Sequence, residues 1–185
     1  RKLSIAATAI DSGGHHTSEV YKFVKPRRAR RIHAVIGRAG AGRTIAGNFM
    51  TNNKAKVMLY TIGVDNAKAT LYQRLQLQTI GPGFIHFPFE PEKRCDDFYL
   101  KGLLSEKLVM NFKNGKKKWE WKKIVTRNEP LDTFVYALGA MEIYPPNFER
   151  LKRDLLWKLY CGRYRTDYFY QHYLLATHHQ NRSEE

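Results

Sequence analysis

Two acidic residues occupy positions where an α/β protein could bind a metal ion. Asp11 ends an apolar stretch, residues 3–11, and is followed by Ser-Gly-Gly. This pattern predicts a buried strand that ends at the carboxyl edge of a sheet, where ligands and metals collect in α/β folds. Asp132 lies in the first turn of a predicted helix, where the helix dipole favours a charged carboxylate. Each also has an ordinary explanation, an Asx turn for Asp11 and a dipole-complementing acid for Asp132.

The composition favours a nucleic-acid substrate for this pair of carboxylates. The 185 residues include 32 Lys and Arg against 17 Asp and Glu, a formal net charge of +15. A globular chain this basic favours nucleic acid over an anionic membrane surface as its partner. Two divalent ions roughly 4 Å apart can then activate a water and stabilise the leaving oxygen of a phosphodiester. His15 and Glu129 are auxiliary candidates, although helix entry and helix capping would also explain them.

A glycine-rich segment, VIGRAGAGRT at residues 35–44, nearly matches the phosphate-binding loop G-x-x-x-x-G-K-[ST]. Arg43 stands where the lysine belongs, and residues 44–53 contain a glycine and three asparagines, which are poor helix formers. A P-loop-like nucleotide hydrolase is therefore the less favoured hypothesis. The alternatives are an anion-binding nest beside Arg38 and Arg43, which would suit a DNA phosphate, and a flexible surface loop.

Basic residues cluster in two further segments, residues 25–31 (KPRRARR) and residues 113–123 (KNGKKKWEWKK). The second belongs to a predicted hairpin over residues 107–124, with Asn114-Gly115 as its two-residue turn. Trp119 and Trp121 share one face of this hairpin, and we expect them to pack in the core. The basic side chains are predicted to contact phosphates of double-stranded DNA without reading bases. The predicted contacts are Arg27, Arg28, Arg30, Arg31, Arg38, Arg43, Lys113, Lys116, Lys117 and Lys118.

The remaining elements predict an α/β fold. Strands are expected at residues 31–36 and 57–63, helices at 17–24 and from Asp65 onward, and loop from the glycine-rich segment to residue 53. Asp65 is predicted to cap its helix and Lys68 to be exposed, while His33 is predicted to pack in a strand. Residues 96–109 are predicted to be helical in their first part. A later helix, with Asn128 as its cap, is predicted to bury Leu131, Phe134, Val135 and Leu138.

Several classes of protein are excluded or disfavoured. The chain has no run of 18 apolar residues and no visible signal peptide, so no membrane partner is expected. Cys95 and Cys161 lack CxxC spacing, which indicates a reducing compartment and no structural zinc. A tail helix is predicted at residues 147–160. We therefore expect one domain at residues 1–145 and a helical tail at 146–185.

Five ordered motifs resemble the large terminase subunit of lambda-type tailed phages. They are IDSGGHHTSEVYKFVKPR, VIGRAGAGR, LYTIGVDNAKATLYQRL, GPGFIHFP and RNEPLDTFVYALGA. The resemblance covers the C-terminal nuclease domain, from about residue 3 to residue 143. In that family an N-terminal packaging ATPase precedes a nuclease of RNase H-like fold, which implies a mixed sheet flanked by helices, here with an added basic hairpin and C-terminal helices.

The resemblance implies an activity, a cofactor and partners. Asp11 would be the acid on the fourth strand of the family's fold, and Asp132 the acid on its late helix. Together they would bind two Mg²⁺ or Mn²⁺ ions and cut concatemeric viral double-stranded DNA. The terminase small subunit and the portal are the implied protein partners, and the cytoplasm of the bacterial host is the implied location.

Two departures from the family pattern affect the expected activity. The family's first catalytic aspartate lies on a strand that would precede Arg1, and Ile36 stands where the family often has a lysine. We therefore expect this chain alone to cut DNA weakly or not at all. Three hypotheses follow: a phage terminase nuclease domain, a DNA-binding fragment of the same ancestry without catalysis, and a nucleotide hydrolase.

Overall fold

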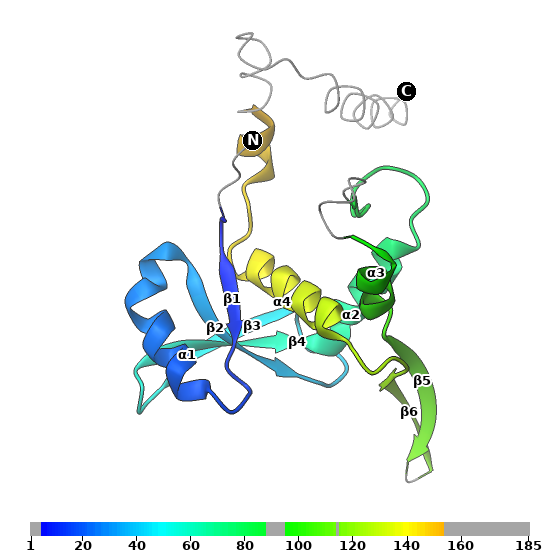
Figure 1. The fold of residues 1–185 in the computed structure, drawn as a ribbon, viewed down its shortest axis with the longest axis horizontal. Helices are drawn as coiled ribbons and strands as arrows, with labels where there is room; N and C mark the ends of the chain where they lie inside the picture. The colour runs from blue at the N-terminus through cyan, green and yellow to red at the C-terminus, as the bar shows by residue number, and fades with distance from the viewer. Residues whose placement is uncertain (1–4, 88–94, 114, 154–185) are drawn as a thin grey trace. The chain divides into compact units, whose positions relative to one another are not determined.

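The protein is a mixed α/β structure in a computed structural model that describes residues 5–87, 95–113 and 115–153. One sheet has four strands in the order β1-β2-β4-β3, and a separate hairpin has two (Figure 1). The strands are β1 (Thr8–Asp11), β2 (Ile32–Arg38), β3 (Ala46–Asn52), β4 (Val57–Gly63), β5 (Glu106–Lys113) and β6 (Lys116–Lys123). The helices are α1 (Thr17–Val24), the 3₁₀ helix η1 (Lys25–Arg30), α2 (Val64–Leu75), α3 (Asp97–Leu103) and α4 (Glu129–Ile143).

Three parallel strands end at the same edge of the sheet. β1 pairs with β2 and β2 with β4 in parallel, whereas β3 is antiparallel to β4. The carboxyl ends of β1, β2 and β4 therefore meet at one edge, where ligands bind in open α/β sheets. Asp11 is the last residue of β1, so its carboxylate lies at this edge, as the sequence predicts.

Helices cover both faces of this sheet. Ala34 of β2 and Leu59 of β4 are paired, and they pack with Val24 of α1 in one buried cluster. Gly37 and Ile62 are likewise paired but contact α4 instead, and Ile62 packs directly on Gly139. Ala34 and Gly37 are three residues apart on β2, and Leu59 and Ile62 are three residues apart on β4. An odd separation places residues on opposite faces of a strand, so the two pairs face opposite sides of the sheet. A mixed sheet flanked by helices is consistent with the predicted RNase H-like fold.

The region after the glycine-rich loop is the main departure from the sequence prediction. Residues 46–52 form β3, an edge strand, where loop was predicted. Pairing with β4 and the ring contact between Phe49 and Tyr60 stabilise this strand despite its glycine and asparagines. A strand therefore follows the loop, which lacks the helix N-terminus that a P-loop directs at phosphates.

Most other element predictions are confirmed. The helix at Thr17–Val24, the strand at Val57–Gly63, the hairpin and the short helix α3 all form. The first strand is shorter than predicted: it spans Thr8–Asp11 rather than residues 3–11. Asn114 lies outside the described residues, whereas Gly115 has the positive φ of +72° that the predicted turn requires.

The chain divides into two compact units. The first contains the sheet and the hairpin, through Tyr72 and again over His86–Tyr144. The second contains Gln73–Ile85 and the chain from Pro145. Residues 148–153 are helical, in agreement with the start of the predicted tail helix, and the rest of that tail with Cys161 lies outside the described residues. None of the helices that the structure describes is long and apolar enough to cross a membrane.

Candidate active site

The Asp11 carboxylate lies exposed at the sheet edge and is held by two neighbours. Its Oδ1 accepts a hydrogen bond of 2.9 Å from the Gly13 backbone N–H, so the Asx turn weighed for this residue does form. The side chain of Tyr136, on α4, also hydrogen-bonds to Asp11. The turn and the tyrosine orient the carboxylate without burying it, which leaves a ligand role compatible with this geometry.

The hydroxyl of Tyr136 is affected by the charges of both acidic candidates. Burial, together with the negative charges of Asp11 and Asp132, raises the pKa of its hydroxyl to about 12. The hydroxyl is therefore protonated at neutral pH and donates to Asp11. A Cβ atom at Gly37 would lie 2.9 Å from this hydroxyl, so the first glycine of the glycine-rich loop leaves room for Tyr136.

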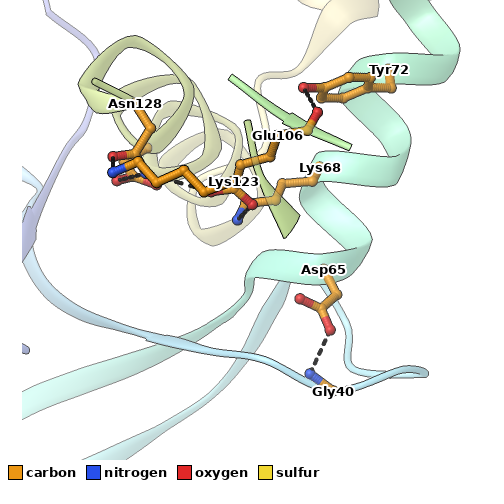
Figure 2. Close-up of polar contacts among 8 residues, drawn as sticks. Gly40, Asp65, Lys68, Tyr72, Glu106, Lys123 and Asn128 are labelled. Carbon is orange, nitrogen blue, oxygen red and sulfur yellow. Dashed lines mark hydrogen bonds and ion pairs between the residues drawn. The ribbon is translucent and has the colours of Figure 1, made fainter. Parts of the chain in front are cut away.

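Asp132 is half-buried on α4, where Asn128 holds it. The Asn128 amide donates to Oδ2 of Asp132 at 2.9 Å and to Oε1 of Glu106 at 3.4 Å, and its oxygen accepts from Lys123 at 2.7 Å. Figure 2 shows this cluster between α4 and the base of the hairpin. Burial raises the pKa of Asp132 above its ordinary value, and Lys68 opposes this while Glu106 reinforces it.

A buried ion pair lies behind this amide. Lys68 of α2 donates to Glu106 of β5 at 2.7 Å, and each side chain is 10% exposed (Figure 2). The Tyr72 hydroxyl donates to the backbone oxygen of Glu106 at 2.6 Å and secures the start of the hairpin. The prediction of an exposed Lys68 is wrong, because Lys68 lies three residues before the buried Leu71 on the covered face of α2.

Asp65 has a different role from the one predicted. Its Oδ2 accepts from the Gly40 N–H at 2.8 Å, so the carboxylate ties the glycine-rich loop to α2 (Figure 2). Arg43 is turned back on the same loop, where its Nε donates to the Ala39 carbonyl at 3.0 Å. The Gly40 N–H is therefore committed to a protein carboxylate, and the residue predicted to cap α2 anchors a loop instead.

The predicted DNA contacts lie on two separate parts of the first unit, around η1 and β2 and on the hairpin. Arg27 and Arg31 lie over the rings of Phe23 and Tyr144, at 4.1 and 3.8 Å from the ring centroids. Arg27 is half-buried, and the other predicted DNA contacts whose side chains are described are exposed. The side chain of Lys113 is not among those described. The exposed set is Arg28, Arg30, Arg31, Arg38, Arg43, Lys116, Lys117 and Lys118. Their contacts with DNA stay a prediction.

The two auxiliary candidates and the predicted packing histidine are also placed. His15 is exposed just before α1, and exposed Glu129 pairs with Arg127 at 3.3 Å. His33 packs edge-on against Tyr60 with ring centroids 5.2 Å apart, as predicted. Burial, and then the charge of Arg28, lower the pKa of His33. An auxiliary role for His15 or Glu129 stays a prediction.

Sequence reasoning missed the residues that hold the acids. Asn128 and Tyr136 lie four residues before and after Asp132, a spacing that places all three on one side of a helix. That spacing is the signal that would have found them. Asn128 is the N-cap residue of α4, as predicted, although its side chain makes no capping hydrogen bond. Glu106 carried no local signal, because its partners lie 38 and 22 residues away in sequence.

The carboxylates of Asp11 and Asp132 are the type of ligand that a divalent metal ion requires. Carboxylate oxygens are the hard ligands that Mg²⁺ and Mn²⁺ prefer. Within residues 5–87, 95–113 and 115–153, no three or more His, Cys, Asp or Glu side chains form a group that could hold a metal ion. Asp11 and Asp132 therefore match metal ligands in type, and the described part of the chain adds no third.

Comparisons with known proteins show which family the chain is similar to. A family model described as "Terminase large subunit gpA, endonuclease domain" matches residues 1–153. The chain is 35% identical over 146 residues to "Terminase, large subunit" of Escherichia phage lambda, covering 77% of the chain and 23% of that protein. It is 29% identical over 159 residues to the same subunit of Enterobacteria phage P21, covering 83% and 24%. The chain thus spans about a quarter of these curated relatives. No solved structure matches it.

Proposed function

The chain belongs to the endonuclease-domain family of the terminase large subunit gpA, and we propose that it is a metal-dependent nuclease that cuts concatemeric viral double-stranded DNA. The observation that supports this proposal is that α4, which carries Asp132 and Tyr136, packs against β1, which ends in Asp11. One acid comes from the carboxyl edge of the sheet and the other from α4, and both charges act on one hydroxyl. Packaging partners such as the small subunit and the portal belong to the same proposal.

The two carboxylates would hold Mg²⁺ or Mn²⁺. When bound, the ions would activate a water and stabilise the leaving oxygen of the phosphodiester. The protein's own contribution is orientation. Tyr136 and the Gly13 N–H fix Asp11, while Asn128 fixes Asp132.

The buried network behind Asp132 supports that orientation. Every polar atom of the Asn128 amide has a partner, because its nitrogen donates to two carboxylates and its oxygen accepts from Lys123. The amide cannot turn over without losing these bonds. Lys68 in turn holds Glu106 by an ion pair. Because Asn128 donates to both Glu106 and Asp132, the orientation of its amide toward Asp132 depends on this ion pair between α2 and β5. Partners of metal ligands commonly tune metal affinity in this way.

The test is metal binding and cleavage by aspartate variants. We expect Asp11→Asn and Asp132→Asn each to lose Mn²⁺ binding in calorimetric titration and any EDTA-sensitive nicking of supercoiled plasmid, because each removes a charged ligand. Asp97→Asn is the matched control, since Asp97 is an exposed acid in the first turn of α3. Unchanged Mn²⁺ binding and unchanged nicking in both variants would contradict the proposed site.

A DNA-binding module without catalysis is the second candidate function. The absence of a third ligand from the described residues favours it, because positioned metals carry most of the catalysis in such sites. This alternative predicts salt-dependent DNA binding by the wild-type chain, with no EDTA-sensitive nicking at any Mn²⁺ concentration. Any EDTA-sensitive nicking would exclude this alternative. If nicking is too weak to detect, the calorimetric titration separates the two candidates, because only the nuclease requires Mn²⁺ binding that is lost in Asp11→Asn and Asp132→Asn.

A further inference from the structure

The outer part of the hairpin exposes an apolar face. Leu108, Met110 and Phe112 are paired with Trp121, Trp119 and Lys117, and directly paired residues project from the same face of a ribbon. Four of these side chains are large, apolar and exposed, and we call them the apolar hairpin face. They are Leu108 (46% exposed), Met110 (42%), Phe112 (69%) and Trp119 (60%).

Among the residues that the structure describes, α2 covers the base of this face. Trp121 packs against Tyr72 of α2 with ring centroids 5.1 Å apart, next to the buried Glu106. Trp119 lies one pleat further along β6 and is exposed, so the prediction that it packs in the core is wrong. The strand continues past the helix that covers its base. Contiguous exposed apolar side chains of this kind mark interaction sites.

The charge of the hairpin indicates which partner the apolar face binds. Residues 106–123 contain seven lysines and two glutamates. Glu106 is paired with Lys68, and Glu120 with Lys118 at 2.8 Å. A second copy of this chain would oppose lysines to lysines, which is unfavourable. An anionic partner with apolar surfaces fits instead, and nucleic acid offers both, phosphates for lysines and bases for aromatic rings.

Two aromatic rings and a cation meet at the outer end of the apolar hairpin face. Phe112 is directly opposite Lys117, and Trp119 follows Lys117 on the same face of β6. In an intact duplex the faces of the bases are covered by stacking, so rings can stack on bases only where a strand is open or the duplex is distorted. Resting on the proposed function for DNA as the substrate, we propose that Phe112 and Trp119 stack against unpaired bases of DNA.

The test compares three DNA substrates bound by the 185-residue chain. They are a 20-nucleotide single strand, the matching duplex, and that duplex with a central unpaired bubble, each titrated by fluorescence anisotropy at several salt concentrations. We expect Phe112→Ala and Trp119→Ala each to weaken binding to the single strand and the bubble by roughly tenfold. Binding to the intact duplex should change much less. The slope of log affinity against log salt should stay constant, because no phosphate contact is lost.

A lysine variant and an aromatic control sharpen this test. The Lys116, Lys117 and Lys118 triple alanine variant should instead flatten the salt slope by roughly two to three units on every substrate. Phe49→Ala removes an aromatic ring of similar exposure on β3 and should change neither affinity nor slope. Trp119→Phe should retain most of the binding, because it keeps a ring at that position.

The outcomes separate failure of this inference from failure of the proposed function. If the wild-type chain binds none of the three substrates, the proposed function fails. If it binds and only the lysine variant weakens, the proposed function stands and the stacking role is wrong. Equal weakening of Phe112→Ala on all three substrates, or conversion of a dimer to a monomer in sedimentation with DNA affinity unchanged, would also overturn the stacking role. Thermal unfolding of each variant verifies that it is folded.

Discussion

Two lysine–glutamate pairs of this protein have almost the same length and opposite surroundings. Lys68–Glu106 measures 2.7 Å with both side chains 10% exposed, and Lys118–Glu120 measures 2.8 Å with side chains 58% and 38% exposed. The first joins α2 to β5, while the second joins two residues of one strand. Distance alone does not set the energy of such pairs, because water screens the exposed pair, whereas the buried pair depends on its partner for solvation.

The comparison distinguishes two parts of one hairpin. Its base adjoins the candidate site, since Glu106 and Lys123 both hydrogen-bond to the Asn128 amide that holds Asp132. Its outer part is surface, with exposed lysines and the apolar hairpin face. A change at the base should therefore alter stability and metal binding, while a change near the turn should alter DNA binding with stability largely retained.

The largest expected effect is that of breaking the buried pair. Lys68→Met leaves Glu106 charged, buried and without its cation, and should lower the free energy of unfolding by about 3–5 kcal/mol. Lys118→Met removes the equivalent cation from the exposed pair, which water already screens, so it should lower the free energy of unfolding far less than Lys68→Met does. Urea denaturation followed by circular dichroism measures both.

A double variant tests the reason for this difference. Lys68→Met combined with Glu106→Gln removes both charges, and it should recover much of the stability lost by the single variant, because no buried charge is left unpaired. Equal, small losses for Lys68→Met and Lys118→Met would show that burial does not distinguish the two pairs.

An intermediate effect is expected for the amide that links the hairpin base to Asp132. Asn128→Ala removes the donor that orients Oδ2, so Mn²⁺ affinity should fall by about 10–100-fold, as for other partners of metal ligands. Asn111→Ala is the matched control, since Asn111 also donates its amide to a glutamate, Glu120 at 3.1 Å, but on the exposed hairpin. Calorimetric titration with Mn²⁺ measures both. A variant at Asn128 with wild-type affinity would make the amide purely structural.

The sequence predicts local elements better than contacts between them. The helix at Thr17–Val24 and the hairpin are confirmed, because periodicity and a turn signal lie within each segment. Strand β3 was missed, because its stability comes from pairing with β4 rather than from its own residues. A run such as residues 44–53, with weak propensity for any element, takes its structure from its neighbours.

The same limit applies to the site. Asp11 and Asp132 could be proposed from the sequence, because the end of a strand and the first turn of a helix can each be recognised within one segment. Lys68 and Glu106 could not be paired, because 38 residues separate them and neither has an unusual local pattern. The difference between Trp119 and Trp121 was equally hidden, since it depends on where α2 stops covering the ribbon.

The smallest expected effect extends the contrast between buried and exposed charge to His33. Partial burial disfavours its charged form, and Arg28 adds to this, so the pKa of His33 in the folded protein lies below the ordinary value of 6.5. Below about pH 6.5 the unfolded chain therefore binds more protons at this residue than the folded protein does, and stability is lost as pH falls through that range to the folded pKa. His33→Phe keeps a ring against Tyr60 and has no proton to bind, so its unfolding free energy should decline less between pH 7 and pH 5. Parallel urea titrations at several pH values measure the difference, and an identical pH dependence in both proteins would show that His33 stays accessible to protons in the folded sheet.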